Sequence, residues 1–143
     1  MRIYIAARHE RREEMVAVAC RLVAAGHEIV SRWLRGKGRH ARPGVNATYH
    51  ATDIVVAEVF VIFTEDPRQD FPARTASAHH TELGYALRAG KRIIVVGPRQ
   101  NIFHHVTEIE RYTSVDQMMR ALAPAGAGGA GPVLLATDHD NAA

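Results

Sequence analysis

The sequence predicts a single α/β domain, in which helices cover both faces of a parallel β-sheet. Short apolar runs, typical of buried strands, alternate with longer segments whose apolar residues recur at helical spacing. The clearest unit joins the run at residues 59–63 to a second run at 92–96 through a helix at 77–90. A strand, a helix and a strand in this order form a βαβ unit, whose two strands are parallel.

Most of the elements are bounded by residues that favour helix ends. Gly26 and Gly90 follow apolar-periodic segments and suit the left-handed residue that ends a helix. Ser77 can cap the helix that Gly90 ends, and Ser114 with Gln117 fits a capping box at the start of the last helix. The predicted strands cover residues 1–5, 27–33, 59–63, 92–96 and 108–112, and the predicted helices cover residues 10–25, 45–57, 77–90 and 114–122.

The order of these elements is most simply a flavodoxin-like (Rossmann-like) fold with a five-stranded parallel sheet. In the first strand, Tyr4 is expected to face the opposite side from Ile3 and Ile5, because side chains alternate along a strand. The apolar residues of the helix at 45–57 predict the face that it turns toward the sheet. That inward face should consist of Ala47, Ala51, Ile54 and Val55.

Composition favours a globular protein rather than a disordered one. The chain has 143 residues, of which 47% are hydrophobic, and a formal charge of +3. No apolar run approaches the roughly 20 residues of a membrane span, and the N-terminus has no signal peptide, so we expect a cytoplasmic protein with no membrane partner. The domain should cover residues 1–123, followed by a Gly/Ala-rich flexible tail at 124–143. Cys20 is the only cysteine and lies among apolar residues, so we expect a buried thiol and no disulfide.

Acids and bases alternate over most of the chain, which disfavours nucleic acid as a partner. The exception is residues 32–44, because no acid occurs between Glu28 and Asp53. Glycines and a proline predict a loop there. It is either a solvated surface loop or an electropositive wall that attracts a phosphate, and nucleic-acid binding is a third interpretation. Trp33, near its start, can stack on a base or belong to the core.

Several common enzyme motifs are missing from the sequence. The dinucleotide fingerprint GxGxxG does not follow the first strand, and neither GxxxxGK[ST] nor GxSxG occurs. Histidine pairs at residues 79–80 and 104–105 invite a metal interpretation, but the spacing of HExxH or of zinc ligands is absent. We therefore predict no metal site and no cofactor.

Glu82 is the residue best placed for chemistry. It should lie near the first turn of its helix, where free backbone N–H groups and the helix dipole favour a carboxylate. Open α/β sheets bind ligands at this edge, and an ionised glutamate there can attack the anomeric carbon of a sugar. Tyr4 could orient that glutamate through its hydroxyl. The alternative is that Glu82 is only a surface partner of the helix dipole.

A glutamate that attacks a sugar needs a second group to help the leaving base depart. The crevice is expected to collect three strand ends, at residues 6–8, 64–66 and 97–98. The sequence does not rank the candidate second carboxylates by distance. These candidates are Asp53, Glu65, Asp66 and Asp70.

Several segments also match a known family. The most specific is ELGYA at residues 82–86, inside the longer block HTELGYALRAGKR. The shorter matches are IYIAA at 3–7, AAGHE at 24–28, VFVIFTE at 59–65, VVGP at 95–98 and NIFH at 101–104. From about residue 2 to residue 122, in this order and with suitable spacing, the chain resembles the nucleoside 2-deoxyribosyltransferase-like family.

The resemblance implies an enzyme that cleaves or transfers the N-glycosidic bond of a nucleoside or nucleotide. Glu82 would be the nucleophile and Tyr4 its positioning residue. The glycosyl-enzyme intermediate would be resolved by another base in a transferase, or by water in a hydrolase. The resemblance also implies a homo-oligomer, a dimer or higher, in which Asn101 and Phe103 are candidates to complete a neighbour's site. The other candidate substrate-binding residues are Ala6, Ala7, Arg8, Thr64, Glu65, Ser77, His79, Gly97 and Pro98.

The chain departs from the family pattern at three places. Glycines are absent at residues 76–79 and at the end of the first strand, and the third strand ends in Thr64 and Glu65 where an aspartate is common. A module of the same fold that senses a nucleotide without chemistry is therefore the alternative function.

Overall fold

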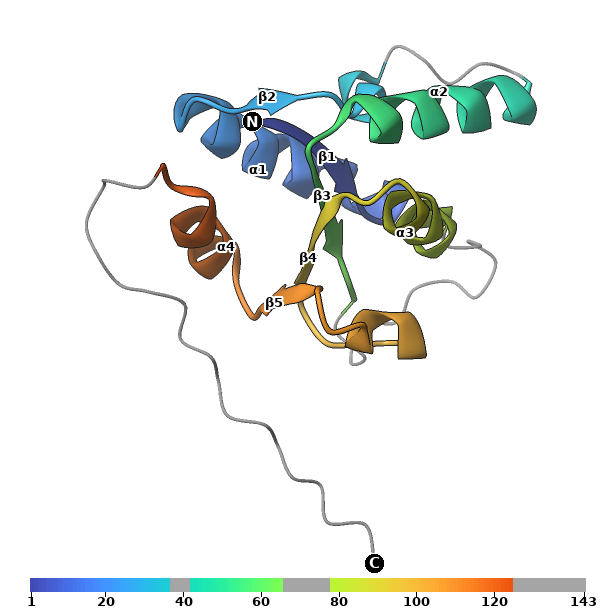
Figure 1. Ribbon diagram of the computed structural model, residues 1–143. Coiled ribbons are helices and arrows are strands. Elements are labelled where there is room, and N and C mark those ends of the chain that lie inside the picture. The colour runs from blue at the N-terminus through green and yellow to red at the C-terminus, as the bar shows by residue number, and fades with distance from the viewer. Residues whose placement is uncertain (37–41, 66–77, 125–143) are drawn as a thin grey trace, which may run out of the picture.

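The computed structural model describes residues 1–36, 42–65 and 78–124, and it confirms the predicted flavodoxin-like fold. Five parallel strands form one sheet in the order β2-β1-β3-β4-β5, with helices on both faces (Figure 1). The strands are β1 (Arg2–Ala6), β2 (Glu28–Ile29), β3 (Val59–Phe63), β4 (Arg92–Val96) and β5 (Glu110–Tyr112). The helices are α1 (Arg12–Ala24), α2 (Pro43–Val56), α3 (Ala78–Arg88) and α4 (Val115–Leu122), and three 3₁₀ turns are η1 (His9–Arg11), η2 (Arg32–Arg35) and η3 (Ile102–His105).

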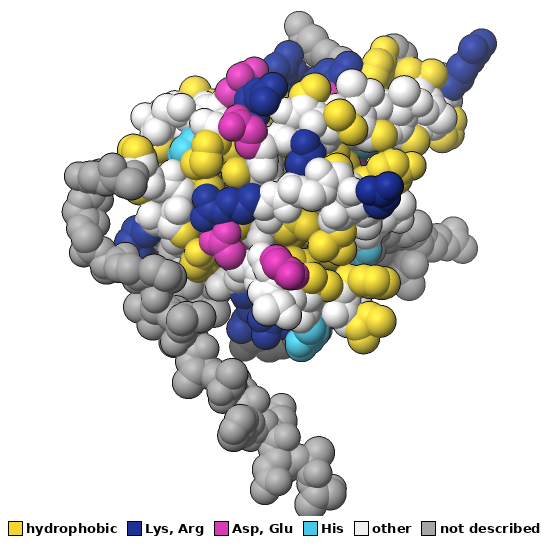
Figure 2. Space-filling model, viewed as in Figure 1, with side chains coloured by type: hydrophobic (Ala, Val, Ile, Leu, Met, Phe, Trp, Pro, Cys, Tyr) yellow, Lys and Arg dark blue, Asp and Glu magenta, His cyan; other side chains and the backbone are white. Residues whose placement is uncertain are grey.

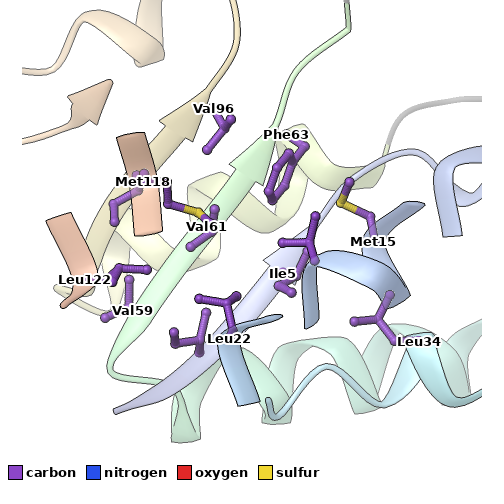
Figure 3. Close-up of a cluster of buried hydrophobic side chains, with 13 residues drawn as sticks. Ile5, Met15, Leu22, Leu34, Val59, Val61, Phe63, Val96, Met118 and Leu122 are labelled. Carbon is purple, nitrogen blue, oxygen red and sulfur yellow. The ribbon is translucent and has the colours of Figure 1, made fainter. Parts of the chain in front are cut away.

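The sheet divides the core into two apolar layers, because alternate side chains of each strand point to opposite faces. Ile3 and Ile5 of β1 belong to the layer under α1 and α4, shown in Figure 3. Tyr4, between them, belongs to the layer under α2 and α3, as predicted. Its ring stacks on that of Phe60 in β3, with the ring centroids 5.6 Å apart and the planes 5° from parallel. The core thus holds the Tyr4 ring on the α2 and α3 side of the sheet.

The second strand is much shorter than the predicted 27–33, because side chains replace the backbone of β2 beside Ile5. The Ser31 hydroxyl accepts a hydrogen bond from the Ile5 N–H at 2.6 Å, and the Trp33 indole donates to the Ile5 carbonyl at 2.7 Å. With both polar groups of Ile5 satisfied, the chain leaves the sheet and forms η2. Trp33 packs against both core clusters, which supports its structural interpretation.

The predicted helix ends are confirmed where the structure describes them. Gly26 and Gly90 have φ angles of 87° and 65°, in the left-handed region that glycine occupies without strain. The Ser114 hydroxyl accepts a hydrogen bond from the Gln117 N–H and so caps α4. The Gln117 side chain accepts from the backbone N–H of Thr113 rather than from that of Ser114, which makes a shifted version of the capping box. Ser77 and residues 125–143 of the predicted tail lie outside the described residues.

Two burial predictions are wrong, because Cys20 lies off the buried face of α1 and the buried face of α2 differs from the predicted one. Cys20 is exposed, since α1 turns Met15, Val18 and Leu22 toward the sheet. In α2, Ala47 is exposed and Val55 is 62% exposed, whereas Asp53 and Ile54 are buried. A polar face of α2 is therefore directed into the molecule. No helix in the described part of the chain is both long and apolar enough to cross a membrane.

Candidate active site

Three side chains from three elements meet beneath α2 and α3. The Tyr4 hydroxyl of β1 donates a hydrogen bond to Oε1 of Glu82 in α3 at 3.0 Å. Nδ1 of His50 in α2 lies 2.5 Å from the same carboxylate oxygen and 2.9 Å from the Tyr4 hydroxyl. Within the described residues, Oε2 of Glu82 and Nε2 of His50 form no hydrogen bond. The cluster therefore leaves one carboxylate oxygen and one imidazole nitrogen for other partners.

Burial sets the protonation of the tyrosine. Tyr4 is fully buried, and burial together with the Glu82 carboxylate raises the pKa of its hydroxyl well above the ordinary value of 10.0. The hydroxyl therefore stays protonated and acts as a fixed donor to Glu82. Glu82 itself is only 9% exposed, so its carboxylate is held inside the molecule by these donors.

Glu82 lies just past the first turn of its helix. It is the fifth residue of α3, which begins at Ala78, and no acidic residue occupies the first turn. Its partners are therefore Tyr4 and His50 rather than the free N–H groups at the helix start. The interpretation of Glu82 as a surface residue is wrong, because Glu82 is buried.

His50 is the member of the cluster that sequence reasoning missed. Its pKa is raised above 6.5, mainly by the hydrogen bond to Glu82, which outweighs the opposing effect of burial. Asp53 adds to the increase and Arg32 opposes it. The available signal was the spacing of His50 and Asp53, which at i and i+3 share one helix face.

Asp53, a candidate second carboxylate, is bound by an arginine. It is 5% exposed, and its oxygens accept from the Arg32 guanidinium at 2.6 Å and from the Arg32 backbone N–H at 3.0 Å. The Arg32 guanidinium also lies over the Tyr49 ring, 4.3 Å from its centroid. This pair joins η2 to α2, so Arg32 is a structural residue rather than part of a phosphate-attracting wall. Residues 37–41 of that basic segment lie outside the described residues.

Glu65, the other described candidate carboxylate, belongs to a second polar cluster at the strand ends. Its Oε1 is 3.1 Å from Nε of Arg8 and 3.6 Å from Nε2 of His79, and Glu65 and His79 are both buried. His79 is 1% exposed, and burial lowers its pKa from 6.5 to about 3, so its ring is neutral at pH 7. Within the described residues, neither ring nitrogen of His79 has a hydrogen-bond partner. Asp66 and Asp70 lie outside those residues.

Further histidines continue from that cluster toward η3. The His80 ring lies between those of His79 and His104, with centroids 4.2 Å and 5.5 Å away. Burial lowers the pKa of His104 to about 4. The Asn101 amide bonds to both His80 and His104, and its oxygen caps η3 by accepting from the Phe103 N–H. Among the described residues, no group of three or more potential ligands is arranged to hold a metal ion.

The ends of β3 and β4 are fixed to each other. The Thr64 hydroxyl donates to the Pro98 carbonyl at 2.7 Å, and the Thr64 carbonyl accepts from Arg11 at 3.0 Å. Gly97 has a φ of 117°, and a Cβ atom at this position would lie 2.5 Å from the Thr64 hydroxyl. These contacts pack the ends of β3 and β4 closely against each other.

The remaining predicted residues fall into different environments. Ala6 is fully buried in the core under α2 and α3, whereas Ala7 is half-buried. Phe103 is 58% exposed, whereas the other predicted substrate-binding residues that the structure describes are buried or half-buried. Hydrophobic side chains gather over α3 and η3 on the face shown in Figure 2. Tyr85 of α3 and Ile102 of η3 are 56% and 80% exposed.

The comparisons with known proteins find similarity at the level of three-dimensional structure. Neither a scan of protein-family models nor a search of curated proteins gives a match. Among solved structures, the chain is similar to the CMP N-glycosidase BcmB of Clostridium botulinum, with a TM-score of 0.56 and 18% sequence identity. What the two proteins share is a fold. The similarity covers 85% of this chain and 98% of the other.

Proposed function

We propose that this protein cleaves the N-glycosidic bond of a nucleotide or nucleoside, with Glu82 as the nucleophile. The observation that carries the proposal is a buried carboxylate whose one oxygen is held by Tyr4 and His50, while the other takes no hydrogen bond from the described residues. Because the bonded oxygen holds the carboxylate in place, the second oxygen, Oε2, has a fixed position and can attack a carbon placed against it. The fold shared with a CMP N-glycosidase supports a nucleotide as the substrate.

The proposed reaction has two steps. Oε2 of Glu82 attacks the anomeric carbon, the carbon–nitrogen bond breaks, and its electron pair leaves with the base. The sugar is then bound to Glu82 as an ester. Water releases it as a free sugar in a hydrolase, and an incoming base releases it as a new nucleoside in a transferase.

The test is to incubate the protein with ribo- and deoxyribonucleoside monophosphates and the corresponding nucleosides, with and without a free acceptor base. Chromatography should show release of the base, and exchange without net hydrolysis would identify a transferase. Glu82→Gln keeps the shape of the side chain but removes the nucleophile, so we expect activity to fall by a factor on the order of 10³ or more. Intact-mass measurement of the wild type should detect a sugar adduct that Glu82→Gln lacks.

Glu110→Gln is the matched control, because Glu110 also accepts a hydrogen bond from a tyrosine hydroxyl, that of Tyr112 at 2.8 Å. It lies on the edge strand β5, away from the cluster at Tyr4. We expect this variant to retain activity. If the wild type releases no base from any substrate, the proposal fails, and calorimetry showing tight nucleotide binding would then indicate the sensing module.

A further inference from the structure

The cleavage of a nucleoside requires a proton donor as well as a nucleophile, and the structure offers an imidazole for that role. The departing base carries the electron pair of the broken bond, and protonation makes it a better leaving group. Asp53 and Glu65 are both paired with arginines. Among the described ionisable side chains, the only one that bonds Glu82 besides Tyr4 is His50. Tyr4 is unsuited, because its raised pKa makes it a weak acid.

The two nitrogens of His50 have different surroundings. Nδ1 faces Glu82 and Tyr4, so it carries a proton that it donates to the carboxylate. The side chain is 33% exposed, three times the 11% of the Glu82 side chain. Since Nε2 forms no hydrogen bond within the described residues, the opposite edge of the ring can meet a ligand. The ring therefore holds the nucleophile at one edge and presents a second nitrogen at the other.

Charges around His50 favour its protonated form. Glu82 in α3 and Asp53 in α2 stabilise an imidazolium, while Arg32 in η2 and burial oppose it, and the net effect raises the pKa. Tyr4 in β1 stays neutral and adds no charge. These surroundings therefore favour the imidazolium, with a proton on Nε2, more than water does, which suits a general acid.

We propose that His50 protonates the departing base through Nε2 and then, as neutral imidazole, accepts a proton from the water that releases the sugar. This inference rests on the proposed function, and it assigns to a histidine the role for which the sequence offered only carboxylates. In the first step, the electron pair of the carbon–nitrogen bond passes to the base, which takes the Nε2 proton. In the second step, the water oxygen bonds to the anomeric carbon, its proton passes to Nε2, and the ester electron pair returns to Glu82.

The test compares two substrates that share one sugar phosphate. The first is the nucleotide that the wild type cleaves best, and the second carries 4-nitrophenolate, which leaves without needing a proton. For His50→Gln we expect kcat/KM on the nucleotide to fall by about 10²- to 10⁴-fold, and kcat/KM on the nitrophenyl substrate by less than about fivefold. In the wild type, the nucleotide rate should decline as pH rises through the pKa of His50, and His50→Gln should lack this decline.

Azide tests the second step separately, because it attacks without losing a proton. With the nitrophenyl substrate, His50→Ala should accumulate the sugar ester on Glu82, and added azide should restore turnover and yield a glycosyl azide. His105→Gln, at an exposed histidine of η3, is the matched control and should behave as the wild type.

Two results would overturn the assignment. An equal loss on both substrates would mean that His50 only positions Glu82, and an unchanged nucleotide rate would mean that it has no role. Failure of the proposed function has a different signature, since the wild type would then act on neither substrate, or Glu82→Gln would retain activity on both.

Discussion

The hydroxyl oxygen of Tyr4 lies 3.0 Å from Oε1 of Glu82, although 78 positions separate the two residues. A strand of the sheet and a helix of the covering layer supply one partner each. The contact needs the correct strand alternation in β1 and the correct rotation of α3 at the same time. It is therefore a sensitive point at which to test the site.

Removing the Tyr4 hydroxyl should weaken catalysis without unfolding the protein. Tyr4→Phe keeps the ring stacked on Phe60 but deletes a fixed donor to Glu82. We expect kcat to fall by about 10- to 100-fold and the free energy of unfolding by about 1 kcal/mol. Steady-state kinetics and urea denaturation measure the two effects. Tyr112→Phe, which deletes a tyrosine–glutamate bond on the edge strand, should leave kcat unchanged. Equal kinetic losses in both variants would contradict a specific role for Tyr4.

Breaking the Arg32–Asp53 pair should loosen the helix that carries His50. Asp53 is buried and accepts two hydrogen bonds from Arg32, so Asp53→Asn should lower the free energy of unfolding by about 1–3 kcal/mol. Urea denaturation measures this change. Glu58→Gln is the comparison, because the Arg2–Glu58 pair is exposed on both sides and such pairs contribute little. A larger loss in Glu58→Gln than in Asp53→Asn would show that burial of the pair does not matter.

A side chain at Gly97 should distort the packed ends of β3 and β4. Its φ of 117° strains any other residue, and a new Cβ atom would meet the Thr64 hydroxyl at 2.5 Å. We therefore expect Gly97→Ala to lower the free energy of unfolding by about 1–3 kcal/mol, with a matching decrease in the thermal midpoint. At Gly44, in the first turn of α2, a Cβ atom would have no neighbour within 4 Å. Gly44→Ala should be neutral or stabilising, and a cost equal to that of Gly97→Ala would refute the steric argument.

Acid should destabilise the protein through His79. Its pKa is about 3 when folded and about 6.5 when unfolded, so between these values the unfolded chain binds more protons. The contribution of the buried neutral His79 to the free energy of unfolding is fully present above pH 6.5 and is lost as pH falls toward 3. The stability of His79→Gln should accordingly depend less on pH between about 7.5 and 5 than that of the wild type, as urea denaturation at several pH values would show. An unchanged slope in His79→Gln would contradict the prediction.

The exposed apolar surface at η3 bears on the expected homo-oligomer. Ile102 and Phe103 are 80% and 58% exposed, and Tyr85 of α3 is exposed as well. Apolar groups of this size in one region are typical of an association surface. We expect sedimentation velocity to show a dimer or larger species, and Ile102→Asp to shift it toward the monomer. Val23→Asp, at a residue of α1 that is 56% exposed, is the matched control. A monomeric wild type would contradict the prediction.

Sequence reasoning could predict the fold because the signals that identify each strand and helix are local. The apolar runs of β3 and β4 and the glycines that end α1 and α3 each identify an element without reference to the rest of the chain. Tyr4 and Glu82 were predicted to act together because strand alternation and the family resemblance point to the same pair. Their contact is visible only when β1 and α3 are packed together.

His50 was missed for a physical reason. The apolar residues of α2 predicted an inward face that includes Ala47 and Val55, yet both are exposed. The actual inward face carries Asp53, whose burial is possible only because Arg32, distant in sequence, binds it. A polar residue turned inward by a partner elsewhere in the chain does not contribute to the apolar periodicity from which a buried face is predicted. The length of β2 was overestimated in the same way, since the side chains of Ser31 and Trp33 replaced its backbone.

The position of Cys20 has a practical consequence. It is the only thiol in the chain, it is exposed, and it lies on α1, whereas the catalytic candidates lie beneath α2 and α3 on the other face of the sheet. A maleimide dye or a spin label can therefore be attached to the unmutated protein at one defined point. The reporter would be separated from the reacting groups by the full thickness of the sheet.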